Sequence, residues 1–304
     1  MLFSQLERSL IVHAPAKLNL FLEILARRGD GYHEIETVMV SVGIHDTLAF
    51  ADDEAGAVRL EVRDATPASD SLDSAGEGPL PTDARNLVVR AAELLRSECG
   101  VQRGARITLV KRIPAASGLA GGSSDAAATL AALNRLWGLG LSRNELVELA
   151  SRLGSDVPFF FAPTGIAVAR GRGERLEPLD ARGGMHFVIV RPSSGLSTAE
   201  VYRHCRAAER PRPVGPMIDA LRRGRIDRVA RQLHNALQSP AESLNAEVRR
   251  CGAWFDKQSV LGHRMSGSGT AYFGVCATRA QARAVAGRVR AARLGRAFVA
   301  RSGT

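Results

Sequence analysis

A run of glycines and serines over residues 114–128, PAASGLAGGSSDAAA, leads directly into an alanine-rich segment. Glycine has no Cβ atom, so backbone N–H groups in such a run can approach a ligand closely. The start of the predicted helix adds unpaired N–H groups and the positive end of the helix dipole, which together favour an anion. The pattern indicates a phosphate-binding loop, but a flexible turn with Ser123 as a helix N-cap is the alternative that the loop alone leaves open.

The loop is not one of the common nucleotide-binding motifs. No Gly-Lys-Ser/Thr follows at the spacing of a Walker loop, and the glycines do not form Gly-x-Gly-x-x-Gly. Gly118, Gly121 and Gly122 are the positions where bare backbone would meet phosphate oxygens, and Ser123 and Ser124 add hydroxyl groups there. The loop predicts phosphate binding without defining the reaction.

Two charged residues could take part in proton transfer. Asp156 stands in the segment GSDVPFF, and Lys17 stands in the apolar segment PAKLNL. A carboxylate can accept a proton from a hydroxyl group, and a neighbouring ammonium favours both the ionised carboxylate and the developing alkoxide. Each residue also has an ordinary interpretation, because Asp before a turn that begins with Pro is a common N-cap and a single Lys is usually solvated.

Aromatic residues at two places could stack on a base. Tyr32 and His33 follow the turn sequence RRGDG, and Tyr202 lies in the segment GLSTAEVYRH, whose Ser197 and Glu200 have the spacing of a capping box. The alternatives are an aromatic that caps the turn and, for Tyr202, packing in the core. Near the C-terminus the segment SGSG would by itself be only a turn.

Composition and charge limit the class of protein. The chain has 304 residues, of which 45% are hydrophobic, which is enough for one large or two ordinary domains with a buried core. The net charge of +10 suggests a polyanionic partner: nucleic acid, a membrane surface or phosphorylated small molecules. Arginines are spread along the chain and only 5% of residues are aromatic, so we expect solvated faces and an attraction for phosphates, with no nucleic acid or membrane partner.

The cysteines and the apolar segments indicate a soluble cytoplasmic protein. Four cysteines at irregular spacing match no zinc or iron–sulfur motif and are too sparse for a disulfide framework, so we expect reduced thiols. The N-terminus lacks the pattern of a signal peptide, and no stretch reaches the roughly 18 apolar residues of a membrane span.

Periodicity predicts strands and helices in both halves of the chain. Strands are expected at 10–26, 35–50, 57–62 and 105–113, a hairpin at 165–179 and a loop at 64–84. Helices are expected at 86–98, after the glycine loop, at 142–154, at 226–238, near 241–258 and over the arginine-rich segment 279–301. This mixture predicts an α+β fold with a boundary near 160–185, which we place between a domain of 1–170 and a domain of 171–304.

Three separate segments together resemble one known family. They are PAKLNLFLEI near the N-terminus, the loop 114–128, and MSGSGTAYF near the C-terminus. In this order they resemble the motifs of the GHMP kinases, which phosphorylate small molecules such as galactose, homoserine and mevalonate. The resemblance extends over residues 12–273. It implies a two-domain α+β architecture in which the N-terminal domain has a mixed sheet and the phosphate loop, and the C-terminal domain is an α/β sandwich of ferredoxin-like type.

The resemblance also assigns roles in ATP-dependent phosphoryl transfer. It places the catalytic base at Asp156, with Lys17 beside it. It assigns binding of the ATP phosphates to Pro114, Ala115, Ala116, Ser117, Gly118, Leu119, Ala120, Gly121, Gly122, Ser123 and Ser124. It assigns the acceptor pocket to Asn19, Tyr32, His33, Thr198 and Tyr202, and a second loop against the phosphates to Gly267, Ser268 and Gly269.

Within the family, the segments are most similar to those of members whose acceptor is a polyol linked to cytidine diphosphate. His33 would then bond the edge of the cytosine, with Tyr32 on one face and Tyr202 on the other. The alternatives are a kinase of a smaller alcohol, a basic nucleic-acid-binding module, or a binding protein without activity. Retention of both Lys17 and Asp156 argues against the last of these.

The sequence departs from the family pattern in the loop itself. Ala120, and the alanines in PAAS, stand where many relatives have glycine, and we expect the change to be tolerated because neighbouring glycines remain. ATP implies Mg²⁺, but no metal ligand is assigned: Ser123 or Ser124 and the phosphates are the expected contacts, with Asp125 or Asp156 as further possibilities. We expect small-molecule substrates and either a monomer or a homodimer.

Overall fold

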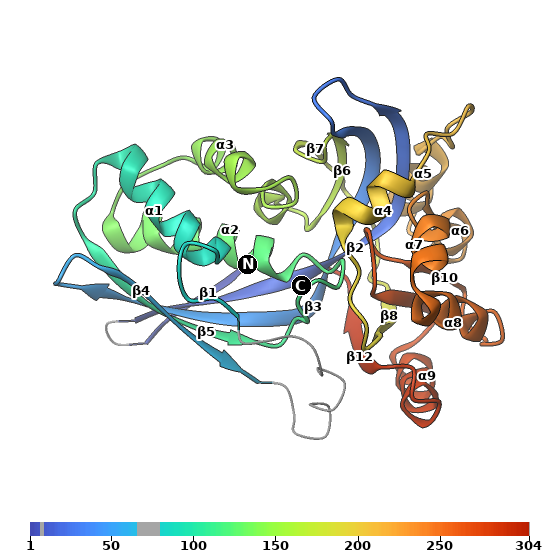
Figure 1. Ribbon diagram of the computed structural model, residues 1–304. Helices are drawn as coiled ribbons and strands as arrows, with labels where there is room; N and C mark the ends of the chain where they lie inside the picture. The colour runs from blue at the N-terminus through green and yellow to red at the C-terminus, as the bar shows by residue number, and fades with distance from the viewer. Residues whose placement is uncertain (7–8, 66–79, 304) are drawn as a thin grey trace.

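Two long antiparallel strands form the middle of the larger sheet. The computed structural model describes residues 1–6, 9–65 and 80–303, in which β2 covers Ser9–Arg27 and β3 covers His33–Asp53 (Figure 1). Leu18 pairs with Val40, and the pairing continues from Leu10 to Arg27 with three irregularities. Most of the middle of β2 is buried, because helices cover one face of the sheet and the second half of the chain packs against the other.

The larger sheet is mixed, with the order β1-β2-β3-β5-β4. Strand β6 pairs with β3, β7 pairs with β6, and the pairs β4–β5 and β2–β9 are parallel. The bounds are β1 Leu2–Leu6, β4 Val58–Asp64, β5 Gly104–Lys111, β6 Ile166–Gly171, β7 Arg175–Pro178 and β9 His234–Asn235. Helices α1 Leu87–Cys99, α2 Gly121–Trp137 and α3 Arg143–Leu153 lie on one face (Figure 1).

The glycine-rich loop joins the end of β5 to the start of α2. Strand β5, which lies between β3 and β4, ends at Lys111. Helix α2 begins at Gly121 and packs its alanine-rich face against β2 and β3. The short 3₁₀ helix η2, Pro158–Phe161, packs beside α2 and α3. The loop and the segment before η2 are thereby held by buried elements.

The smaller sheet is antiparallel, with the order β10-β11-β8-β12. Its strands are β8 His186–Arg191, β10 Gly262–Met265, β11 Tyr272–Cys276 and β12 Arg296–Arg301. Helices α8 Ala246–Phe255 and α9 Arg279–Ala291 lie on its outer face (Figure 1). The other helices are α4 Thr198–His204, α5 Gly215–Arg222, α6 Ile226–Gln232 and α7 Gln238–Leu244.

A shared core joins the two sheets. Leu18 and Phe21 of β2 lie in one buried cluster with Phe187 of β8 and Phe273 of β11. This packing fixes the second half of the chain against the middle of β2. The α+β prediction is confirmed.

Three predicted helices were wrong in extent. The helix expected near 241–258 is divided at Asn245, whose side chain accepts hydrogen bonds from the N–H groups of Glu247 and Val248 and so caps α8. The helix expected at 226–238 ends at Gln232, and β9 then pairs with β2. The arginine-rich helix ends at Ala291, because the chain turns at Arg293 with φ of 49° and enters β12.

The strand pairing also bears on the domain boundary. Strands β6 and β7 both belong to the larger sheet, and the smaller sheet begins with β8. The division at 170/171 remains a prediction, and the pairing favours a boundary between Pro178 and His186. Most of the loop expected at 64–84 lies outside the described residues, within 66–79. In the described part of the chain, no helix combines the length and hydropathy needed to cross a membrane.

Candidate active site

One cavity of about 1050 Å³ brings the predicted site residues together. Nearly all of those residues line it: Lys17, Asn19, Tyr32, His33, Pro114, Ala115, Ala116, Ser117, Gly118, Ala120, Gly121, Gly122, Ser123, Asp156, Thr198, Tyr202, Gly267, Ser268 and Gly269. Leu119 and Ser124 do not, because both side chains are fully buried below the loop. The backbone carbonyl of Leu119 still accepts a hydrogen bond of 3.0 Å from the N–H of Lys17.

The loop makes close approaches that only glycine permits. A Cβ atom on Gly118, whose φ is 77°, would lie 2.2 Å from the carbonyl oxygen of Ser266. Ala116 and Ala120 have φ of 45° and 54°, so the two alanines occupy the left-handed region that favours glycine.

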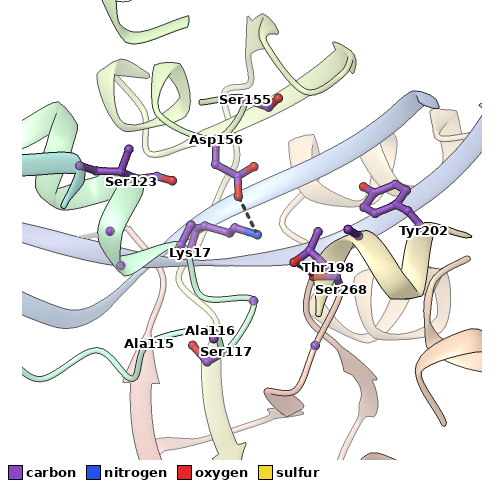
Figure 2. A pocket seen from close by; sticks show the side chains of 18 of the residues that line it. Lys17, Ala115, Ala116, Ser117, Ser123, Ser155, Asp156, Thr198, Tyr202 and Ser268 are labelled. Carbon is purple, nitrogen blue, oxygen red and sulfur yellow. Dashed lines mark hydrogen bonds and ion pairs between the residues drawn. The ribbon is translucent and has the colours of Figure 1, made fainter. Parts of the chain in front are cut away.

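Ser123 is not the N-cap of α2. Ala120 occupies that position, which places Ser123 inside the first turn, with its hydroxyl toward the cavity in Figure 2. The N-cap interpretation of Ser123 is therefore wrong.

Lys17 and Asp156 form an ion pair in the wall of the cavity. Lys17 is 3% exposed, and its Nζ lies 2.6 Å from Oδ1 of Asn19 and 3.5 Å from Oδ2 of Asp156 (Figure 2). The Asp156 side chain is 38% exposed, so its carboxylate can meet a ligand. The N-cap position of η2 is Val157, and no side chain caps that helix, so the carboxylate does not act as the cap that its sequence allows.

Ser266, which the sequence did not single out, ties the three motifs together. Its hydroxyl donates to the carbonyl of Gly118 at 3.1 Å and accepts from the N–H of Asn19 at 3.2 Å. Asn235 supports the second loop, since its Nδ2 donates to the carbonyl groups of Met265 and Gly267, each at 2.8 Å. Ser266 stands in the SGSG segment and could have been noticed there, whereas nothing near Asn235 marks it.

Aromatic side chains line the end of the cavity that lies opposite the glycine loop. The rings of His33 and Tyr202 are 5.2 Å apart and inclined at 38°, while Tyr32 is 53% exposed and lies under the guanidinium of Arg172 at 5.0 Å. Burial lowers the pKa of His33, helped by the charge of Arg27, so the ring is neutral at pH 7. A neutral imidazole can both donate and accept hydrogen bonds, which suits recognition of a base edge.

The second loop reaches the same end of the cavity. Thr198 Oγ1 and Ser268 Oγ are 2.8 Å apart, joining the start of α4 to that loop. Burial, with a contribution from the charge of Asp156, raises the pKa of Tyr202 and keeps its phenol protonated. In Figure 2, Lys17 and Asp156 lie between Ser123 on one side and Thr198, Ser268 and Tyr202 on the other.

The cavity also has a mostly apolar part beside the glycine loop, which we call the apolar slot and which the sequence did not predict. Leu80, Pro81, Leu87 and Leu109 line it, together with Arg85, and a Cβ atom on Gly122 would lie 3.7 Å from Leu87. Asn86 also lines it, but its amide already caps α1 and bonds the carbonyl of Pro81. If the loop binds the phosphates of a nucleotide, the base of that nucleotide can occupy this slot. The residues come from three separate elements, which is why local sequence gave no indication of it.

The residues that could contact a metal are few. Within the described ranges, no group of three or more His, Cys, Asp or Glu is arranged to hold a metal ion. Ser123 reaches the cavity and Ser124 does not. Asp125 has a buried Oδ1 atom without a hydrogen-bond partner in the described chain, and burial together with Asp46 raises the pKa of Asp125 to about 7, against the lowering effect of Lys111.

The excess positive charge belongs to the second half of the chain. Residues 181–304 contain 22 Lys and Arg against 7 Asp and Glu, whereas residues 1–180 contain 19 against 24. A charge distribution of this kind raises the local concentration of anionic small molecules near the surface that carries it. The charge is compatible with anionic substrates.

Comparisons with known proteins match both halves of the chain. The model described as GHMP kinases N terminal domain matches residues 86–163, and the model described as GHMP kinases C terminal matches residues 217–293. A 4-diphosphocytidyl-2-C-methyl-D-erythritol kinase from Pelotomaculum thermopropionicum is 44% identical over 279 residues, which cover 91% of this chain and 92% of that protein. The protein of that name from Exiguobacterium sibiricum is 40% identical and covers 87% of this chain and 88% of its own.

Solved structures give the same result. A crystal structure of 4-(cytidine 5'-diphospho)-2C-methyl-D-erythritol kinase matches with a TM-score of 0.78 and 36% identity, covering 97% of this chain and 99% of that one. Homoserine kinase from Cytophaga hutchinsonii has a TM-score of 0.71 at 18% identity, covering 99% of this chain and 96% of that one, and so shares the fold alone.

Proposed function

Because the chain belongs to the 4-diphosphocytidyl-2-C-methyl-D-erythritol kinases of the GHMP kinase family, we propose that its Lys17–Asp156 pair is the centre of phosphoryl transfer. The protein is an ATP-dependent phosphotransferase of the non-mevalonate isoprenoid pathway, and its acceptor is the 2-hydroxyl group of 4-diphosphocytidyl-2-C-methyl-D-erythritol. The observation that carries the residue assignment is the position of this pair between the glycine loop and the aromatic end of the cavity.

Asp156 is the general base. Its carboxylate accepts the proton of the acceptor hydroxyl as the oxygen forms a bond to the γ-phosphorus, and the bond between that phosphorus and the β,γ-bridging oxygen breaks to release ADP. Lys17 stabilises the negative charge that develops on the attacking and transferred oxygens. Asn19 holds the ammonium in place through the bond of 2.6 Å.

The glycine loop positions ATP. The free N–H groups at the start of α2, with the dipole of that helix, favour the triphosphate at residues 114–124. The apolar slot at Leu87 and Leu109 receives the base, so the γ-phosphate points toward Lys17. This arrangement aligns the phosphate with the acceptor and lowers the entropic cost of transfer.

Mg²⁺ fits the residues present. This ion usually takes one or two protein oxygens and completes its shell with phosphates and water, so the absence of a larger acidic group in the described chain suits it. Ser123 would hold the ion together with the ATP phosphates, because its hydroxyl reaches the cavity and that of Ser124 does not. Bound there, the ion would neutralise phosphate charge.

The acceptor base lies at the aromatic end, between Tyr32 and Tyr202, with the neutral His33 at its edge. Replacing Tyr32 by alanine is expected to raise the KM for the acceptor by the equivalent of about 1–3 kcal/mol, the scale of a base–aromatic stack. The KM for ATP should not change, because Tyr32 is not part of the loop and its ring lies against Arg172. Steady-state kinetics with each substrate varied in turn checks this, and an unchanged acceptor KM would exclude Tyr32 from the pocket.

The function is tested by ADP release with ATP and Mg²⁺ across a panel of acceptors. The panel contains the cytidylated methylerythritol, mevalonate, homoserine, galactose and no acceptor. Turnover confined to the first compound is the expected result. Turnover with another alcohol would overturn the acceptor assignment, and no turnover with any acceptor would overturn the kinase assignment for this chain.

We also propose a cellular location, an oligomeric state and a class of partners for the enzyme. All four cysteines are free, as expected of a cytoplasmic protein, and we place the enzyme in the cytoplasm as a monomer or homodimer. Its partners are small molecules, with no nucleic acid or membrane among them.

A further inference from the structure

Three buried charged side chains lie beneath the glycine-rich loop, and the transfer mechanism above uses none of them. Lys111 ends β5, Asp46 lies in β3 and Asp125 is the fifth residue of α2, and they are 7%, 0% and 2% exposed. The Nζ atom of Lys111 is 2.5 Å from Oδ2 of Asp46 and 2.9 Å from Oδ2 of Asp125. One ammonium thus bridges two carboxylates from different elements.

The bridge joins the two ends of the loop. Oδ1 of Asp46 accepts hydrogen bonds of 2.5 Å and 2.9 Å from the N–H groups of Arg112 and Ile113, the first residues after β5. Asp125 belongs to the helix in which the loop ends. We call Asp46, Lys111 and Asp125 the loop clamp, because together they fix both the entry to the loop and its exit.

The loop clamp reaches the wall of the cavity. Lys111 and Asp125 both line it, and a Cβ atom on Gly121 would lie 3.1 Å from the Lys111 ammonium. The ammonium therefore lies against the first residue of α2, where the backbone N–H groups face the cavity. A small movement of the clamp would displace the groups that bind phosphate.

The shape of the loop needs such support. Ala116 and Ala120 are held at φ of 45° and 54°, a conformation that costs an L-residue about 1–2 kcal/mol. Strained residues of this kind persist only where the surrounding structure determines them. A buried ion pair is also weak evidence for a purely stabilising role, because desolvation of the charges offsets their attraction.

We propose that Asp46, Lys111 and Asp125 are positioning residues for phosphoryl transfer, and that they hold the loop in the shape that aligns the phosphates of ATP. The proposal rests on the proposed function only in taking ATP as the ligand of the loop. Asp46 acts on the entry of the loop and Asp125 on its exit, so replacement of either carboxyl group should have the same consequence.

The test compares Asp46→Asn and Asp125→Asn with Asp52→Asn. Each variant keeps the shape of the side chain. Asp52 is the matched control, since it lies in β3 as Asp46 does and pairs with Arg103 at 2.7 Å, but at the far end of the sheet and on the surface. We expect the two clamp variants to raise the KM for ATP and the calorimetric Kd for the analogue AMPPNP by roughly 10- to 100-fold. The acceptor KM of both, and all constants of Asp52→Asn, should match the unmodified protein.

The outcomes separate positioning from stability. Unchanged ATP constants with a lower melting temperature in both variants would overturn the proposal and leave the clamp a structural feature. If one variant does not fold, the other still decides, because each acts on its own end of the loop. If the unmodified protein turns over none of the acceptors but the two variants bind AMPPNP more weakly than it does, the clamp is supported and the kinase assignment is refuted.

Discussion

Replacing Asp156 by asparagine is expected to lower kcat about 10²- to 10⁴-fold, the usual scale for loss of a general base. The amide keeps the size of the side chain but cannot accept a proton from the acceptor hydroxyl. Because the residue is 38% exposed and caps no helix, the melting temperature should stay near that of the unmodified protein. Binding of ATP should also survive, since the loop does not include residue 156.

The measurement is kcat by ADP release at saturating ATP and acceptor, with AMPPNP binding by calorimetry beside it. Asp180→Asn serves as the control, because Asp180 is an exposed carboxylate that does not line the cavity. Near-normal turnover in Asp156→Asn would remove the residue from the mechanism. A loss of AMPPNP binding as large as the loss of kcat would show that it acts on ATP rather than on the acceptor.

Replacing Lys17 by methionine is expected to lower kcat about 10²- to 10³-fold, the scale for removing one group that stabilises developing charge. Methionine fills the same space in β2 but leaves Oδ1 of Asn19 with only the Ser266 hydroxyl, at 3.4 Å, as a donor. Loss of the shorter hydrogen bond in a buried site lowers stability by about 1–3 kcal/mol, so the melting temperature should fall modestly. The KM for each substrate should change far less than kcat.

The double variant Lys17→Met, Asp156→Asn distinguishes a joint role from two separate ones. Groups that act as a unit give strongly non-additive losses, so the double variant should be only slightly slower than the slower single variant. Losses that multiply would indicate that Lys17 and Asp156 act independently. Thermal unfolding of all three variants identifies any loss of activity that comes from unfolding.

The sequence by itself determined the elements whose pattern is local. The alternation of apolar residues in β2 and β3, the glycines before α2, and the capping box at Ser142 and Glu145 that starts α3 each depend on neighbours within a few residues. Local patterns failed where a distant partner decided the outcome. The segment after Gln232 forms strand β9 because it pairs with β2. The segment after Ala291 leads into strand β12 because it pairs with β8.

The chemistry of the site was visible in the sequence only as separate motifs. The glycine loop, Lys17 and Asp156 could each be recognised. The local sequence around Asp156, however, is equally compatible with a general base and with a helix N-cap. The tertiary structure argues against the cap, because Val157 holds the N-cap position of η2. It favours the base by placing the carboxylate 3.5 Å from an ammonium 139 positions away in the chain. Asn235 and the loop clamp could not be found from the sequence, because each acquires its role from contacts between distant segments that only packing brings together.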